Sequence, residues 1–281
     1  MYRELYRFGG VTFALESDAP LERSPVCEAF RVPDGVPDHT ICLRFSDALP
    51  TPPADSLRRD DMFRWQVGAQ RHLLQWVSAP GDIPHFTYAV THGAHTDVIF
   101  ASAYRTGASV STALEAVGLF DVFVARGMLV LHSAYIVTRT GEAILFSGPS
   151  GIGKSTQAAL WQRCAGARVV NGDRALVDVG KKTANGIFYA GTSGISENVT
   201  APVRAIVLLG QGSENRVFVP SPQAAFAGVL SQCAYYDWDV SSAEKMTACV
   251  ARLVSDVPVL RMDCLPDATA VETLRGKLGG I

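Results

Sequence analysis

The stretch from Gly148 to Thr156, GPSGIGKST, constrains this chain more than any other. Its glycines, Lys154 and Ser155 satisfy the pattern G-x-x-x-x-G-K-[ST], and an apolar run, AILFS, comes directly before it. Glycines let the backbone curl so that successive N–H groups point inward, and the start of a following helix adds positive potential. The sequence therefore predicts a strand, a phosphate-holding loop and a helix, in that order.

The residues of this loop have expected roles in binding a nucleotide. We expect the phosphates to be held by Gly148, Pro149, Ser150, Gly151, Ile152, Gly153, Lys154, Ser155 and Thr156. Lys154 is expected to bridge the β and γ phosphates, and the hydroxyl of Ser155 is expected to ligate Mg²⁺. The alternative is a glycine-rich turn with a chance Lys-Ser pair, and the flanking segments argue against it.

Two further residues are candidates for the chemistry. Asp173 ends the segment RVVNGD, so its carboxylate could orient Mg²⁺ or an acceptor hydroxyl. By spacing alone a turn aspartate is an equal alternative. His132, in VLHSAYIV, has apolar neighbours, and a core histidine is the commoner role for such a position.

The pattern along the chain predicts two domains. Residues 1–106 hold short apolar and aromatic runs between turn formers, which indicates a smaller, antiparallel β-rich domain. From Ser109 to Arg126 apolar residues recur every three or four positions, which predicts an amphipathic helix, although Gly118 interrupts it. We expect residues 107–281 to form an α/β domain around the loop.

Further elements are predicted for this second domain. They are a hairpin before the loop, a helix ended by Gly166, a hairpin around Lys181 to Gly186, strands in RAIVLLG and PVLRMDC, and three helices, in PQAAFAGVLSQCAYY, in SAEKMTACVARLVSD and from Asp267 to Leu278.

Composition limits the classes of partner. The net charge of −2 and the pI near 6.3 give no bulk attraction to nucleic acid or to an anionic membrane. The longest apolar run contains Asp121 and Arg126 and is too short to span a membrane. The six cysteines are far apart, which predicts reduced, mostly buried thiols and a cytoplasmic protein.

The stretch from LHSAYIVTRTGEAILFSGPSGIGKST through NGDR resembles the catalytic domain of HPr kinase/phosphorylase and its relatives. That P-loop family is related in fold to phosphoenolpyruvate carboxykinase. The matching positions are His132, the loop from Gly148 to Thr156, and Asp173 with Arg174. The resemblance implies that Asp173 is a metal-associated base or acceptor-orienting group, that His132 supports it, and that several copies of the chain assemble.

The resemblance covers residues 128–179 well and GTSGISENVTAPVRAIVLL more loosely. The second stretch would supply the acceptor-side loop, with Glu197 and Asn198 either binding the acceptor or forming a polar loop. Gly172 stands where the family has the first of two acidic residues, and the family's Glu-x-Arg-Gly signature is absent. Another cation, Arg174 or Arg204, would then meet the charge of the transferred group, although Arg204 also fits a surface position.

These observations predict an ATP- and Mg²⁺-dependent kinase. Lys154, Asp173 and His132 are the expected catalytic residues, and Ser155 and Asp173 the expected metal ligands. The acceptor hydroxyl would belong to a serine of a peptide or small protein, or to a small molecule. The departures argue against HPr itself and against phosphorolysis. They favour, as the alternative, a regulatory protein that binds nucleotide without transfer.

Other clusters have simpler interpretations. HGAH, from His92 to His95 beside Asp97, is expected to be a solvated turn. A metal site is the alternative. Aromatic residues at strand positions are expected in the core, with an acceptor groove as the alternative; these are Trp65, Trp76, Phe86 and Tyr88.

Overall fold

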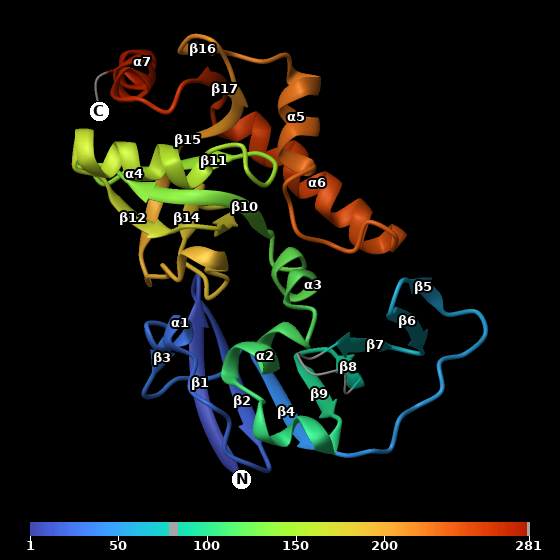
Figure 1. Cartoon of the computed structure of the whole chain (residues 1–281). Coiled ribbons are helices and arrows are strands. Elements are labelled where there is room, and N and C mark those ends of the chain that lie inside the picture. Colours follow the sequence, from blue (N-terminus) through green and yellow to red (C-terminus); the bar gives the residue numbers. More distant parts are fainter. Residues whose placement is uncertain (79–83, 280–281) are drawn as a thin grey trace. The chain divides into compact units, whose positions relative to one another are not determined.

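The computed structural model describes residues 1–78 and 84–279 of the chain (Figure 1). The chain is a mixed α/β protein, as predicted. Contacts divide it into two compact units, Met1–Leu119 and Phe120–Ile281. Among the described residues, no helix combines the length and the apolar content that a membrane crossing requires.

The first unit is built on one sheet, in the order β3-β1-β2-β4-β9-β8-β7-β6-β5. Its strands are β1 Tyr2–Phe8, β2 Val11–Ser17, β3 Arg31–Val32, β4 His39–Phe45, β5 Leu57–Arg59, β6 Met62–Val67, β7 Gln70–Ser78, β8 Pro84–His92 and β9 His95–Phe100. The prediction of a purely antiparallel domain is wrong, because β4 pairs in parallel with both β2 and β9. Between β2 and β4 the chain crosses over through α1, Pro25–Glu28, which alternation of apolar residues does not reveal.

The predicted helix from Ser109 to Arg126 is two short helices, α2 Val110–Glu115 and α3 Leu119–Val124. Gly118 lies between them with a φ of 66°, a left-handed conformation that ends a helix. The N–H of Val110 donates to the carbonyl of Glu22 over 3.0 Å, which ties α2 to the first unit. The division between units therefore falls after Leu119, beyond the predicted residue 106.

The second unit holds an eight-stranded sheet in the order β11-β10-β13-β14-β15-β17-β16, with β12 on β10. A further pairing of β11 with β15 closes five of these strands into a ring. The strands are β10 Met128–Val137, β11 Ala143–Ser147, β12 Arg168–Asn171, β13 Arg174–Asp178, β14 Thr183–Asn185, β15 Thr200–Gln211, β16 Arg216–Phe218 and β17 Val259–Cys264.

Helices cover this sheet in two groups. The longer helices are α4 Lys154–Ala165, α5 Pro222–Leu230, α6 Val240–Asp256 and α7 Ala268–Leu278. α5 and α6 pack into one core, and α4 and α7 pack into the other (Figure 1). β11, β15 and β17 are mutually parallel, so the loop after β11 opens at their carboxyl ends, where ligands bind in open α/β sheets.

Most of the predicted local elements of this unit are confirmed. β10 and β11 form the hairpin before the loop, α4 ends at Gly166 with a φ of 65°, and β13 and β14 form the next hairpin. The six cysteines are free: Cys27 is buried, Cys164 is exposed and the other four are partly buried. The thiols are therefore less fully buried than expected.

Candidate functional site

The loop between β11 and α4 needs its glycines. Gly148, Gly151 and Gly153 have φ angles of 147°, 77° and 111°, which residues with a Cβ rarely adopt. A Cβ on Gly148 would also lie 3.2 Å from Cγ2 of Ile152. The strand, the loop and the helix thus occur in the predicted order, and the loop conformation explains the spacing of the glycines.

Lys154 is held inside this loop. It begins α4, its exposure is only 7%, and its Nζ donates to the carbonyls of Gly148 at 2.9 Å and Pro149 at 3.0 Å. Burial lowers the pKa of Lys154, and the charge of Asp173 opposes that shift. Ser155 and Thr156, in the same first turn, are exposed. The helix therefore offers one fixed cation and two accessible hydroxyls.

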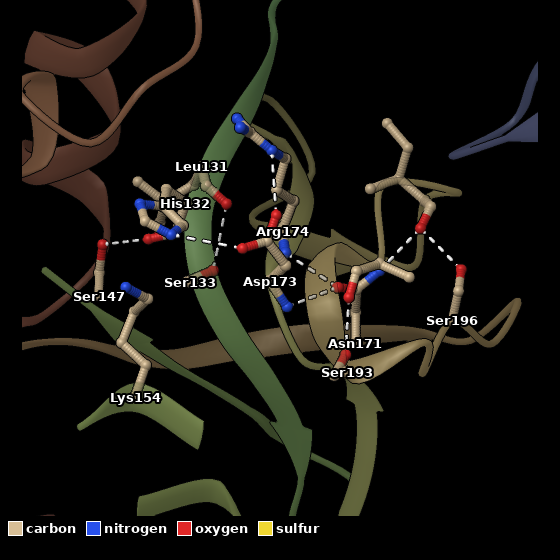
Figure 2. A network of polar contacts seen from close by, with 12 residues as sticks. Leu131, His132, Ser133, Ser147, Lys154, Asn171, Asp173, Arg174, Ser193 and Ser196 are labelled. Carbon is tan, nitrogen blue, oxygen red and sulfur yellow. Dashed lines mark hydrogen bonds and ion pairs between the residues drawn. The ribbon is translucent and has the colours of Figure 1, made fainter. Parts of the chain in front are cut away.

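Asp173 lies between two basic side chains (Figure 2). Its Oδ1 is 3.4 Å from Nε2 of His132, and its Oδ2 is 3.3 Å from Nε of Arg174. The register of β10 and β13 causes this, because it places His132 opposite Arg174, and the N–H of Ser133 donates to the Asp173 carbonyl at 2.8 Å. The structure thus brings two of the predicted site residues, His132 and Asp173, into contact.

The surroundings keep the Asp173 carboxylate ionised. The hydrogen bond from His132 lowers its pKa most, the charges of Arg174 and Lys154 lower it further, and burial opposes them. The side chains of His132 and Asp173 are 26% and 29% exposed. His132 is therefore not a core histidine, and the pair is accessible from solvent.

Asn171 fixes the turn that carries Asp173. Its Oδ1 accepts the N–H groups of Asp173 and Arg174, both at 2.9 Å, and its Nδ2 donates to the carbonyl of Ile187 at 2.7 Å (Figure 2). This residue is not among those predicted from the sequence. Asparagine two positions before an aspartate, with glycine between them, is an Asx-turn signal that could have identified it.

A short segment, η2 Gly191–Ser193, packs directly onto this turn. A Cβ on Gly191 would lie 2.7 Å from Cγ of Asp173, and a Cβ on Gly172 would lie 2.3 Å from Oγ of Ser193. Position 172 therefore has no room for a side chain while Ser193 occupies this space. A carboxylate at position 172, which the resemblance to HPr kinase would predict, therefore does not fit beside Ser193.

Of the other predicted charged residues, only Arg174 lies at the site. Its guanidinium is 5.6 Å from the ring centre of Tyr189. Arg204 donates to the carbonyl of Leu278 at 2.7 Å and lies 3.9 Å from Glu142, beside the start of β11. That is the opposite end of the strand from the loop. Glu197 pairs with Arg168, the first residue of β12.

A pocket of about 590 Å³ borders the beginning of the loop. Gly148 and Pro149 line it, and so does Gln232, whose carbonyl accepts the N–H of His132 at 2.8 Å. Its other walls combine apolar and polar residues: Leu208, Leu209, Phe218, Pro220, Ser221, Ala224, Gly228, Ser231, Arg261 and Asp263. A ligand in this pocket would lie next to the residues that hold Lys154.

Comparison with known proteins provides no family for this chain: no family model matches it, and no curated protein is significantly similar. The geometry of the site is therefore the basis for assigning a function.

Proposed function

We propose that the protein is an ATP- and Mg²⁺-dependent kinase of the HPr kinase and carboxykinase type, which transfers the γ-phosphoryl group to a hydroxyl. One observation carries the proposal. Ser147, the residue before the loop, donates to the carbonyl of His132 at 2.8 Å, and His132 lies 3.4 Å from Asp173, so the loop and the acidic centre are neighbours. A loop that holds phosphate and a carboxylate that orients metal or acceptor are the two parts that phosphoryl transfer needs.

The nucleotide phosphates fit the loop. Its N–H groups and Lys154 would hold the β and γ phosphates, and the exposed hydroxyl of Ser155 and the ionised Asp173 are suitable Mg²⁺ ligands. When bound, Mg²⁺ neutralises phosphate charge. Arg174 adds a second cation beside Asp173, in place of the arginine that the family signature would supply.

Asp173 is better suited to alignment than to strong base catalysis. A carboxylate whose pKa lies below its ordinary value is a weak proton acceptor at neutral pH. Phosphoryl transfer depends mainly on positioning and on charge stabilisation, with little need for a strong base. Asn171, His132 and the packing of Gly191 together hold the carboxylate in one place.

The pocket beside Gly148 and Pro149 is the proposed acceptor site. Its size and mixed lining suit a serine side chain with its neighbouring peptide, or a small alcohol. The pocket adjoins the acidic centre through Gln232, whose carbonyl accepts the N–H of His132, the neighbour of Asp173. In either case the acceptor would enter beside the first residues of the loop.

A regulatory protein that binds nucleotide without transfer is the second candidate. The observation that favours it is the close contact between Gly172 and Ser193, which leaves only one carboxylate in the turn. Such a protein would bind Mg-ATP and leave it intact.

A thermal-shift titration with Mg-ATP, Mg-GTP and Mg-pyrophosphate tests the binding step. A ligand at a hundred times its Kd stabilises the folded state by about 2.7 kcal/mol. We expect this shift in the wild type and in Lys245→Ala, which removes an exposed lysine of α6, and none in Lys154→Ala. No shift with any of the three ligands would overturn the proposal.

Formation of ADP tests transfer itself. The wild type is incubated with Mg-ATP and a panel of serine peptides and small alcohols, and phosphorylated products are identified by mass spectrometry. Product formation that depends on Lys154 supports the kinase. Binding without turnover for the whole panel supports the regulatory protein instead.

A further inference from the structure

A second group of chemically reactive side chains lies on the sheet of the first unit. Cys42 is on β4, His95 and Asp97 are on β9, and Glu16 is on β2. The parallel pairings place Glu16 opposite Cys42 and Cys42 opposite Asp97. His95 is two residues before Asp97 and so points to the same face. Residues far apart in the sequence thus form one cluster.

Three of these four side chains bring their ligand atoms close together. The Sγ of Cys42 and one ligand atom each of His95 and Asp97 lie within 4.8 Å of one another. Nε2 of His95 is 3.3 Å from Oδ1 of Asp97, and Sγ of Cys42 is 3.5 Å from Oε2 of Glu16. Zinc bonds of about 2.0–2.3 Å correspond to ligand pairs about 3.3–3.8 Å apart in a tetrahedron.

We propose that Cys42, His95 and Asp97 bind one divalent transition-metal ion of the zinc class, with Glu16 at the edge of the site. A thiolate and an imidazole favour zinc over magnesium or calcium. Three protein ligands leave the fourth position of a tetrahedral ion for water. This inference is independent of the proposed kinase activity.

The neighbours of the cluster support this ligand set. Arg3 holds Oε1 of Glu16 at 3.1 Å, while Oε2 of the same carboxylate accepts from the Cys42 thiol. Glu16 is thus an outer partner that orients the sulfur of Cys42. The ligands also project from paired strands, which hold side chains more rigidly than loops do.

The cluster revises the expectation for HGAH. His92 and His95 pair directly across the turn between β8 and β9, so the predicted turn is present. The proposed partners of His95 come from other positions in the sheet, and His92 is exposed and outside the cluster. His92→Ala is therefore a matched control for His95→Ala.

The test uses the full chain, stripped of metal with a chelator and titrated with Co²⁺. Tetrahedral Co²⁺ bound to a thiolate shows intense d–d bands and a sulfur-to-cobalt charge-transfer band. We expect saturation at about one Co²⁺ per chain, displacement of Co²⁺ by Zn²⁺, and a rise in the unfolding temperature with Zn²⁺.

Variants assign the ligands. Cys42→Ser is expected to abolish the charge-transfer band, and His95→Ala to weaken Co²⁺ binding by at least about tenfold. His92→Ala and Cys164→Ser, which removes the exposed thiol of α4, should bind as the wild type does. Circular dichroism checks that each variant is folded. The proposal is wrong if the wild type gives no stoichiometric thiolate band, or if the band survives Cys42→Ser.

Discussion

The two units each contain a histidine beside an aspartate at nearly the same distance, in opposite electrostatic surroundings. His132 lies 3.4 Å from Asp173, and His95 lies 3.3 Å from Asp97. The first pair has the cations of Lys154 and Arg174 around it. The second has the thiol of Cys42 and, beyond that, the carboxylate of Glu16.

The charges around each pair determine what it can bind. Positive groups at Asp173 favour an anion such as phosphate, whereas the sulfur and oxygen atoms at Asp97 favour a cation. Exposure differs as well: the side chains of the first pair are 26% and 29% exposed, and those of the second 43% and 60%. A His–Asp pair alone therefore does not specify a function.

The largest expected effect separates the two aspartates. Asp173→Asn should lower the rate of phosphoryl transfer by about 10²–10⁴-fold, because the metal-orienting charge is lost while the shape is kept. The Mg-ATP thermal shift should persist. Asp97→Asn, the matched control, should leave transfer unchanged and weaken Co²⁺ binding. Equal rates for Asp173→Asn and the wild type would remove Asp173 from the proposed site.

The packing at Gly172 gives the next prediction. Gly172→Asp, which adds a second carboxylate to the turn, should destabilise the protein by about 1–3 kcal/mol because its side chain meets Ser193. Ser193→Gly should relieve most of this loss in the double variant. Urea unfolding of all four proteins measures the coupling. If Gly172→Asp alone is as stable as the wild type, a carboxylate at position 172 does fit beside Ser193.

His132→Leu should have a smaller effect on transfer, about 10–100-fold, because it removes an orienting partner of the carboxylate. It should also raise the pKa of Asp173, whose largest lowering comes from His132. The folded-state pKa is depressed, so the carboxylate contributes stability above its unfolded pKa and loses it as pH falls through the folded value. The variant should retain less of this contribution, and carboxyl NMR titration measures the shift directly. An unchanged Asp173 pKa would show that His132 does not act on it.

The local elements of the second unit could be predicted because their signals are local. Gly166 ends α4 and the apolar periods identify β15 and α6 within a few residues. The parallel neighbours of β4 could not be predicted, because strand order depends on pairings between distant segments.

In the candidate site, too, local features could be predicted from the sequence and contacts between distant segments could not. The glycines and Lys154 are adjacent in the sequence, so the loop could be identified from it. The distance from His132 to Asp173 depends on the β10–β13 register, and the contact of Gly191 with Asp173 depends on a turn that only the fold brings near. From spacing alone, Asp173 could therefore be either a turn residue or a residue of the functional site.

The smallest expected effect on transfer is that of removing Arg204, the other candidate for the cation that meets the charge of the transferred group. Arg204 lies 3.9 Å from Glu142 with its side chain 41% exposed, and such a pair contributes about 0–1 kcal/mol. Arg204→Ala also removes the hydrogen bond to the carbonyl of Leu278, so it should lower stability by about 1–2 kcal/mol while leaving both the Mg-ATP shift and ADP formation unchanged. A fall in ADP formation by the folded variant would show that Arg204 contributes to transfer. Unchanged activity would leave Arg174, which lies 3.3 Å from Asp173, as the arginine that supplies positive charge beside the His132–Asp173 pair.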